Sequence, residues 1–310
     1  MLSLPTQDRL SAPVPSVFPA VRAQVGLAPY TSFRVGGKAE WYAEPRTEED
    51  LQACVAWAHS QSLAITMLGS GSNLLISDAG LSGLVISTRF LKQFALDDQA
   101  GRVVVAAGTP LPALSRRLAR RGWRGFEWAV GIPGTIGGAV VMNAGAHGGC
   151  MADCLVSAQV LGADGIELWT PEQLDYGYRH SSVQGSDYIV LSTTLQMEPG
   201  WDPELVKAQT NQALRARKTT QPYDLPSCGS VFRNPLPESA GHLIEAMGLK
   251  GYRIGGAKVA ERHANFILNC GDAKAQDIFF LIRHVQEMVR DRFSLNLHPE
   301  VKMLGEFQPV

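Results

Sequence analysis

The chain has 310 residues, of which 45% are hydrophobic and 18% are charged, and these values predict a globular protein of two or three domains. A formal net charge of −1 gives no general attraction to nucleic acid or to a membrane surface. The sequence has no run of about 18 uninterrupted apolar residues, so no membrane span is expected. Residues 1–20 carry several prolines and no signal-peptide core, and they are expected to form a loose or disordered tail.

Five scattered cysteines, an odd number, are typical of reduced thiols and indicate a cytoplasmic protein. Cys150 and Cys154 could form half of a metal site, but no second pair and no histidine cluster completes it. No metal is therefore expected.

The first unit is expected over residues 21–90, with a β-α-β arrangement. Thr47 and the three acidic residues after it predict a helix N-terminus. The expected elements are, in chain order, a strand at 41–44, a helix from 47 to about 60, and strands at 64–68, 74–76 and 84–86.

The second unit is expected over residues 91–200. Its elements are a strand at 103–105, a helix at 110–122, a hairpin of 155–161 with 166–169, and a strand at 188–197. Trp123, Phe126 and Trp128 are expected to be core residues. The arginines of the helix lie on its other faces without aromatic neighbours, which favours a solvated surface over a nucleic-acid patch; they are Arg116, Arg117, Arg120 and Arg121.

The third unit is expected over residues 201–310, after a boundary at Pro199-Gly200. Asp202, Pro203 and Glu204 are typical of a helix start. The expected elements are that helix to about 218, a turn feeding a strand at 227–235, a short helix at 241–247, strands at 253–254 and 266–268, an amphipathic helix at 275–293, and a strand at 299–304.

Two segments, residues 69–73 and 131–138, are rich in glycine. The second belongs to a stretch, 131–149, in which seven of nineteen residues are glycine. A flexible linker would be rich in serine and charge, whereas this stretch is apolar between its glycines. Such backbone lets a ligand approach closely, with N–H groups aimed at it. We therefore predict a cofactor between two units with its pyrophosphate at both segments, and expect Gly71→Val or Gly134→Val to exclude it sterically.

Neither segment fits a common nucleotide fingerprint. The residues after the first segment, 74–76, form an expected strand, whereas the dinucleotide fingerprint requires a helix there. The phosphate-binding lysine signature is also missing, so kinase or ATPase chemistry has no support.

An ordered series of motifs runs from about residue 24 to residue 307. The motifs are Thr31-Ser32-Phe33-Arg34-Val35-Gly36-Gly37, the 69–73 segment, Gly131-Ile132-Pro133-Gly134, Asn143-Ala144-Gly145-Ala146, Tyr178-Arg179, Gly229-Ser230, His263-Ala264-Asn265-Phe266 and Pro299-Glu300-Val301. Their combination resembles the UDP-N-acetylenolpyruvoylglucosamine reductase family. The resemblance implies an α+β fold of the vanillyl-alcohol-oxidase type, in which FAD lies between two subdomains and a third α+β domain covers the substrate.

The resemblance further implies an enzyme with non-covalent FAD that uses NADPH to reduce UDP-N-acetylglucosamine enolpyruvate to UDP-N-acetylmuramate, in peptidoglycan precursor synthesis. Arg179 matches the cation that stabilises the developing enolate, Glu300 the carboxylate acting with it, and Ser230 the proton donor. Tyr178, Lys218 and Asn234 match substrate positions, with Lys218 near the diphosphate. The residues that match FAD contacts are Gly69, Ser70, Gly71, Ser72, Asn73, Gly131, Ile132, Pro133, Gly134, Thr135, Gly137, Gly138, Asn143, Ala144 and Gly145. A monomer is expected.

The chain departs from the family pattern in places. Tyr30 stands where asparagine is common, and His180 stands where an acid is common, which leaves the partner that orients Arg179 open. The segment 181–185 is short and lacks the insertion that carries a substrate-covering tyrosine, so the chain is placed in the shorter branch.

Two other functions remain open. One is an FAD-dependent alcohol or sugar-lactone oxidase on the same scaffold, although its covalent-flavin versions carry a His or Cys that the 69–73 segment lacks. The other is a flavin- or nucleotide-binding protein without catalysis, which the presence of Arg179, Ser230 and Glu300 disfavours.

Overall fold

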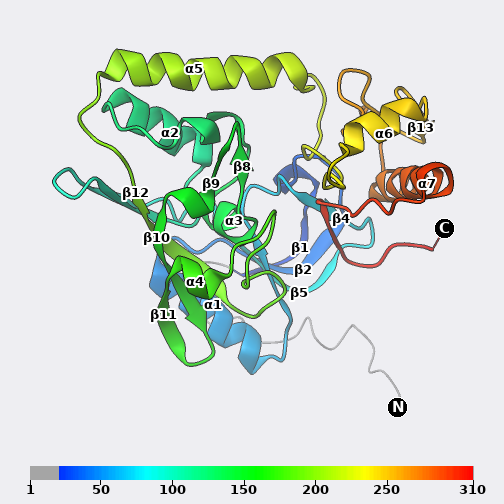
Figure 1. Ribbon diagram of the computed structural model, residues 1–310. Coiled ribbons are helices and arrows are strands. Elements are labelled where there is room, and N and C mark those ends of the chain that lie inside the picture. Colours follow the sequence, from blue (N-terminus) through cyan, green and yellow to red (C-terminus); the bar gives the residue numbers. More distant parts are fainter. Residues whose placement is uncertain (1–20, 310) are drawn as a thin grey trace.

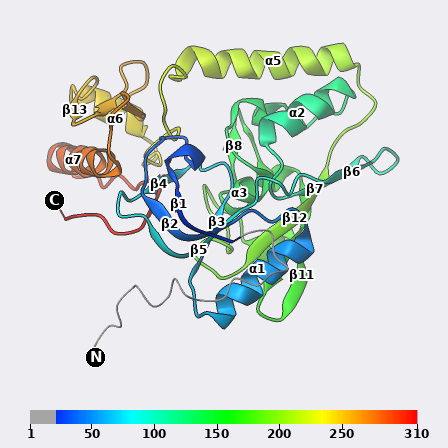
Figure 2. The same ribbon diagram turned by 180° about the vertical axis from the view of Figure 1, so that it is seen from behind.

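The computed structural model describes residues 21–309, and the predicted tail, residues 1–20, lies outside them. Three groups of elements follow one another along this part of the chain. In both ribbon views, the strands β1 and β2 lie between the helix α7 and the strand β12 (Figures 1 and 2).

The first group is a four-stranded sheet of order β1-β2-β5-β3, with β2 and β3 parallel to β5. Its elements are β1 (Arg22–Gly26), a 3-10 turn (Ala28–Tyr30), β2 (Lys38–Ala43), α1 (Glu48–Ser60), β3 (Ile65–Leu68), β4 (Leu74–Ile76) and β5 (Leu81–Ser87). Helix α1 starts as predicted, because the Thr47 hydroxyl accepts from the Asp50 N–H and the Asp50 carboxylate accepts from the Thr47 N–H. The predicted β-α-β unit is therefore confirmed.

The second group is an antiparallel five-stranded sheet of order β11-β10-β12-β7-β6. Its elements are β6 (Phe94–Asp97), β7 (Arg102–Ala106), α2 (Leu111–Arg120), η3 (Glu127–Gly131), α3 (Ile136–Val141), β8 (Gly145–Ala146), β9 (Gly149–Cys150), η4 (Met151–Asp153), β10 (Leu155–Gly162), β11 (Gly165–Trp169), α4 (Pro171–Leu174) and β12 (Ile189–Gln196). Trp123, Phe126 and Trp128 are buried in its core, as predicted.

The third group has a small antiparallel sheet of order β13-β14-β15 and three helices. Its elements are α5 (Pro203–Thr220), α6 (Ala240–Ala246), β13 (Arg253–Ile254), β14 (Ala257–Val259), β15 (Ile267–Asn269), α7 (Ala275–Phe293) and β16 (Lys302–Leu304). The apolar face of α7 packs on Phe33 and Leu75 of the first group. The last strand, β16, pairs in parallel with β4 of the first group.

Helix α5 lies along α2 and η3, away from α6 and α7 (Figure 1). The sequence analysis placed α5 in the third unit, whereas the helix packs on elements of the second group. The unit boundaries at residues 90 and 200 stay predictions.

Three sequence-based element predictions differ from the structure. Residues 227–235 form no strand; Phe232 makes only an isolated bridge to Pro299. The 131–138 segment is not a loop throughout, because Thr135 accepts from the Gly138 N–H at 3.5 Å and begins the helix α3. The strand predicted at 299–304 begins only at Lys302, since the N–H groups of Glu300 and Val301 both donate to the Val231 carbonyl.

Candidate active site

The loop 69–73 joins β3 to β4 and packs against the turn at Tyr30. Gly71 has a φ of +60°, and a Cβ there would lie 2.1 Å from the carbonyl oxygen of Tyr30. Glycine is thus required by the packing of the loop itself. The expectation that Gly71→Val would act on the cofactor directly is wrong, because the side chain would first push the loop off residues 30–31.

This loop meets the second glycine-rich segment, since the Ser72 hydroxyl donates to the Pro133 carbonyl at 2.6 Å. Within residues 21–309, the backbone N–H groups of residues 70–73 have no hydrogen-bond acceptor. Consecutive free N–H groups in a turn form a concave site for an anion. They suit the pyrophosphate of a dinucleotide.

Three cavities of about 330, 460 and 700 Å³ meet at this point, and Thr135 lines all of them. Gly69 lines the second and the third. The cavity of about 330 Å³, which we call the ion-pair cavity, holds Arg179, Ser230 and Glu300. Cavities that share Thr135 and border the free backbone amides suit a ligand as long as FAD, whose pyrophosphate joins two bulky halves.

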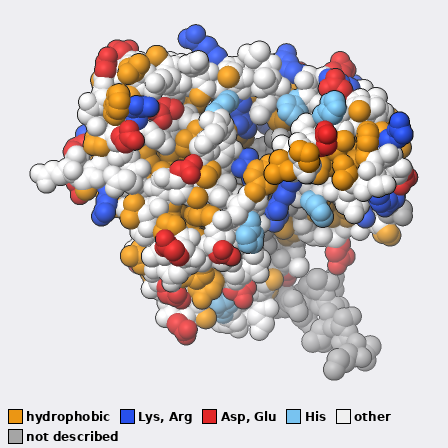
Figure 3. Space-filling model, viewed as in Figure 1, with side chains coloured by type: hydrophobic (Ala, Val, Ile, Leu, Met, Phe, Trp, Pro, Cys, Tyr) orange, Lys and Arg blue, Asp and Glu red, His pale blue; other side chains and the backbone are white. Residues whose placement is uncertain are grey.

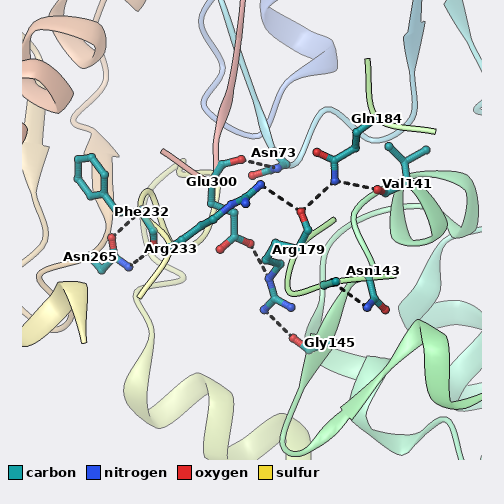
Figure 4. A network of polar contacts seen from close by, with 11 residues as sticks. Asn73, Val141, Asn143, Gly145, Arg179, Gln184, Phe232, Arg233, Asn265 and Glu300 are labelled. Carbon is teal, nitrogen blue, oxygen red and sulfur yellow. Dashed lines mark hydrogen bonds and ion pairs between the residues drawn. The ribbon is translucent and has the colours of Figure 1, made fainter. Parts of the chain in front are cut away.

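Arg179 and Glu300 form an ion pair in the ion-pair cavity (Figure 4). The guanidinium Nε donates to Glu300 Oε1 at 2.8 Å, and Nη2 donates to the Gly145 carbonyl at 2.9 Å. The two side chains are only 21% and 16% exposed. Within the described chain Nη1 has no acceptor, so one edge of the guanidinium is left to bind a ligand oxygen.

Burial raises the pKa of the Glu300 carboxyl above the ordinary value of a glutamate. The positive charge and hydrogen bond of Arg179 act in the opposite direction, followed by the charges of Arg233 and Arg217. The negative charge of Glu300 therefore depends on the arginine beside it.

Ser230 lies in the same cavity at the end of an irregular segment that Asn265 holds in place. The Asn265 side chain accepts from the Phe232 N–H at 2.9 Å and donates to the Phe232 carbonyl at 2.8 Å. Its backbone carbonyl accepts from the Val231 N–H. Two residues of the predicted His-Ala-Asn-Phe motif pack here: Asn265 fixes the chain next to Ser230, and Phe266 is buried.

The structure supplies the orientation of Arg179 that the sequence left open. His180 is exposed and its backbone pairs with Gly177. The acid that Arg179 needs comes from Glu300, 121 residues away in the sequence.

Most of the residues predicted for the site line the three cavities. They are Gly69, Ser70, Ser72, Asn73, Ile132, Pro133, Gly134, Thr135, Gly137, Gly138, Ala144, Gly145, Arg179, Ser230 and Glu300.

Six predicted residues do not line these cavities. Gly71 and Gly131 pack against Tyr30 and Arg217. Asn143 uses both ends of its amide within the protein, donating to the Gly177 carbonyl and accepting from the Ala152 N–H. The remaining three, Tyr178, Lys218 and Asn234, are exposed.

Sequence reasoning missed three residues near the ion pair. Arg217 lines two of the cavities, and the side chains of Arg233 and Gln184 both donate to the backbone carbonyl of Arg179. Lys and Arg side chains gather near the middle of the face in Figure 3, where the α6–α7 part meets the rest of the molecule. No local pattern singles these residues out.

No cluster of three or more His, Cys, Asp or Glu side chains suited to a metal ion occurs in residues 21–309. Over the same residues, no helix has both the length and the apolar character needed to cross a membrane.

Comparisons with known proteins agree with this geometry. Residues 39–170 match the FAD binding domain family, and residues 221–304 match the C-terminal domain of UDP-N-acetylenolpyruvoylglucosamine reductase. The UDP-N-acetylenolpyruvoylglucosamine reductase of Trichormus variabilis is 60% identical over 93% of this chain and 87% of its own length, and that of Synechococcus elongatus 58% over 95% and 98%. The crystal structure of the reductase from Thermus caldophilus is 36% identical, with a TM-score of 0.80 over 92% of this chain and all of the other.

The fold and the site thus define a flavoprotein oxidoreductase with an α+β FAD-binding part and a C-terminal substrate domain. The chain belongs to the UDP-N-acetylenolpyruvoylglucosamine reductase family. The resemblance found in the sequence is confirmed.

Proposed function

We propose that this protein uses NADPH and bound FAD to reduce the enolpyruvyl group of UDP-N-acetylglucosamine enolpyruvate, giving UDP-N-acetylmuramate for peptidoglycan synthesis. The observation that carries the proposal is the Arg179–Glu300 ion pair, which shares one cavity with Ser230 and adjoins the free amides of residues 70–73. We also propose that it works as a monomer and that it lies in the cytoplasm; its five free cysteines support the cytoplasmic location.

Bound FAD would supply the hydride chemistry that links oxidation of NADPH to reduction of the enolpyruvyl group, and the two glycine-rich segments would hold it. The protein's own residues stabilise the charge that develops on the substrate and donate the proton that completes the reduction. Hydride addition places negative charge on the substrate carboxylate as an enolate, and the free edge of Arg179 can stabilise it. Glu300 holds the guanidinium in that orientation. Ser230 would then donate a proton to the neighbouring carbon.

Substrate contacts are proposed for Tyr178, Lys218 and Asn234. The guanidinium of Arg179 lies 5.2 Å from the centre of the Tyr178 ring. The Asn234 side chain accepts from the Ala240 N–H at 3.0 Å, which fixes it at the start of α6. Assignment to the shorter branch also stays a proposal.

Purified protein should be yellow, bleach with NADPH in the absence of air, and regain its colour when the enolpyruvyl sugar is added. The flavin should appear in the supernatant after acid precipitation, because the 69–73 loop has no His or Cys to bond it. An absorbance spectrum of supernatant and pellet checks this. Flavin retained in the pellet would contradict non-covalent binding, and bleaching without recovery would contradict the proposed substrate.

Lys218→Ala should weaken binding of the UDP-sugar by roughly tenfold, since a charge-assisted hydrogen bond to phosphate is lost. The loss should shrink at high salt because the side chain is exposed. Calorimetric titration with UDP-N-acetylmuramate at low and high salt measures it. Arg217→Ala is the matched comparison, since Arg217 is the neighbour that lines the cavities. Unchanged affinity in Lys218→Ala together with weak binding in Arg217→Ala would assign the diphosphate to Arg217.

A further inference from the structure

Arg179 holds an unusual backbone conformation. Its φ is +56°, in the left-handed region that is unfavourable for a residue with a Cβ. Such a conformation persists only where the surroundings hold it. What fixes the backbone of Arg179 therefore also decides where its guanidinium lies.

Two side chains converge on the carbonyl of Arg179 (Figure 4). Gln184 Nε2 donates to it at 2.9 Å and Arg233 Nη2 donates at 3.1 Å. The same Gln184 nitrogen donates to the Val141 carbonyl at the end of α3, also at 2.9 Å. One amide group thus joins the turn carrying Arg179 to α3, the helix that begins within the second glycine-rich segment.

The other end of the same amide reaches the segment of Glu300. Gln184 Oε1 accepts from Lys302 Nζ at 2.8 Å, and Lys302 lies two residues after Glu300 at the start of β16. Asn73 holds Glu300 from its other side by donating to its backbone carbonyl at 3.0 Å. Gln184 is half-buried and not part of the three cavities, so it does not reach the ligand.

We propose that Gln184 is a positioning residue for the enolpyruvyl half-reaction, which holds the backbone of Arg179 and the segment of Glu300 in fixed positions relative to each other. The inference rests on the proposed function. The short segment 181–185 brings Gln184 back under a carbonyl five residues earlier. A glutamine is required because the group must donate to two carbonyls and accept from an ammonium at once.

Gln184→Glu tests this. A carboxylate has the same shape but cannot donate, so two carbonyl oxygens would face a negative group and the Arg179 peptide would move. Displacement of a reacting group by about 1 Å costs on the order of 10²-fold in rate. We expect flavin reoxidation by the enolpyruvyl sugar to slow by that factor, with flavin content and flavin reduction by NADPH unchanged in stopped-flow measurements.

Gln196→Glu is a matched control. Gln196 likewise donates to backbone carbonyls, at 2.9, 3.1 and 3.2 Å, and its Oε1 accepts from Arg102, but it lies at the end of β12 in the second group. Both variants should lower the thermal unfolding midpoint of the apoprotein comparably, whereas only Gln184→Glu should change the ratio of the two half-reaction rates. If Gln184→Glu does not fold, Gln184→Met removes the donors without adding charge.

A double-mutant cycle with Arg179→Lys completes the test. If Gln184 acts through Arg179, Gln184→Glu should add little to the slowing already caused by Arg179→Lys. Additive effects, or equal slowing of both half-reactions, would overturn the inference. Failure of the wild-type protein to be reoxidised by the enolpyruvyl sugar would instead overturn the proposed function.

Discussion

Ser230→Ala is expected to slow reoxidation of the reduced flavin by the enolpyruvyl sugar by ~10²–10⁴-fold, the usual contribution of general acid–base catalysis. Flavin reduction by NADPH should be unchanged, because that half-reaction needs no proton at the substrate carbon. Ser230 lies in the ion-pair cavity with Arg179 and Glu300, so it is placed to donate a proton to the carbon next to the enolate. Stopped-flow absorbance of the two half-reactions, measured separately, decides the matter.

Ser230→Cys should recover part of the lost rate, since a thiol is a stronger acid than a hydroxyl. The competing donor in the cavity is Cys228. Burial raises the pKa of its thiol to about 12, and the Cys228 sulfur donates to the Leu74 carbonyl at 3.3 Å, so it is a poor acid. Cys228→Ala is therefore expected to retain a fast reoxidation. Equal slowing of both half-reactions in Ser230→Ala would show that Ser230 instead supports the flavin or the fold.

Arg179→Met should reduce the rate of flavin reoxidation by ~10²–10³-fold, comparable to the loss of one preorganised oxyanion donor. The variant keeps the aliphatic stem but leaves the enolate without its cation. Arg179→Lys should recover only part of the rate, because a single ammonium cannot contact Glu300, the Gly145 carbonyl and the substrate together. Arg120→Lys, on the exposed face of α2, is the control for the same chemical change.

The pH dependence of Arg179→Met gives a second measurement on the same variant. Burial raises the Glu300 pKa and Arg179 lowers it, so loss of Arg179 leaves the pKa still higher. Glu300 is then protonated at a higher pH as the solution is acidified, so the titration midpoint of its carboxyl, followed by ¹³C NMR, should move to higher pH. Arg179→Lys keeps the charge and should leave that midpoint near its wild-type position. A midpoint that is the same in both variants would contradict the assigned partnership.

Elements whose signals are local could be predicted from the sequence alone. The helix predicted at 275–293 agrees with α7, because five of its apolar residues recur at helical spacing and are buried in the core: Ile278, Leu281, Ile282, Val285 and Val289. Thr47 and Asp50 encode the start of α1 in four residues. The ordered motifs likewise allowed the family to be identified, since each motif is a short run of residues that can be found in the sequence without its spatial neighbours.

Contacts between residues far apart in the sequence depend on the tertiary structure. Arg179 and Glu300 are 121 residues apart, and their contact exists because β16 crosses back to pair with β4 in the first group. Gln184 acquires its role only where three separate segments place two carbonyls and an ammonium around one amide. Arg217, and not its neighbour Lys218, lines the cavities because of how α5 lies over η3. Spacing along a chain encodes periodicity and capping, whereas contacts between distant segments depend on packing that no local pattern contains.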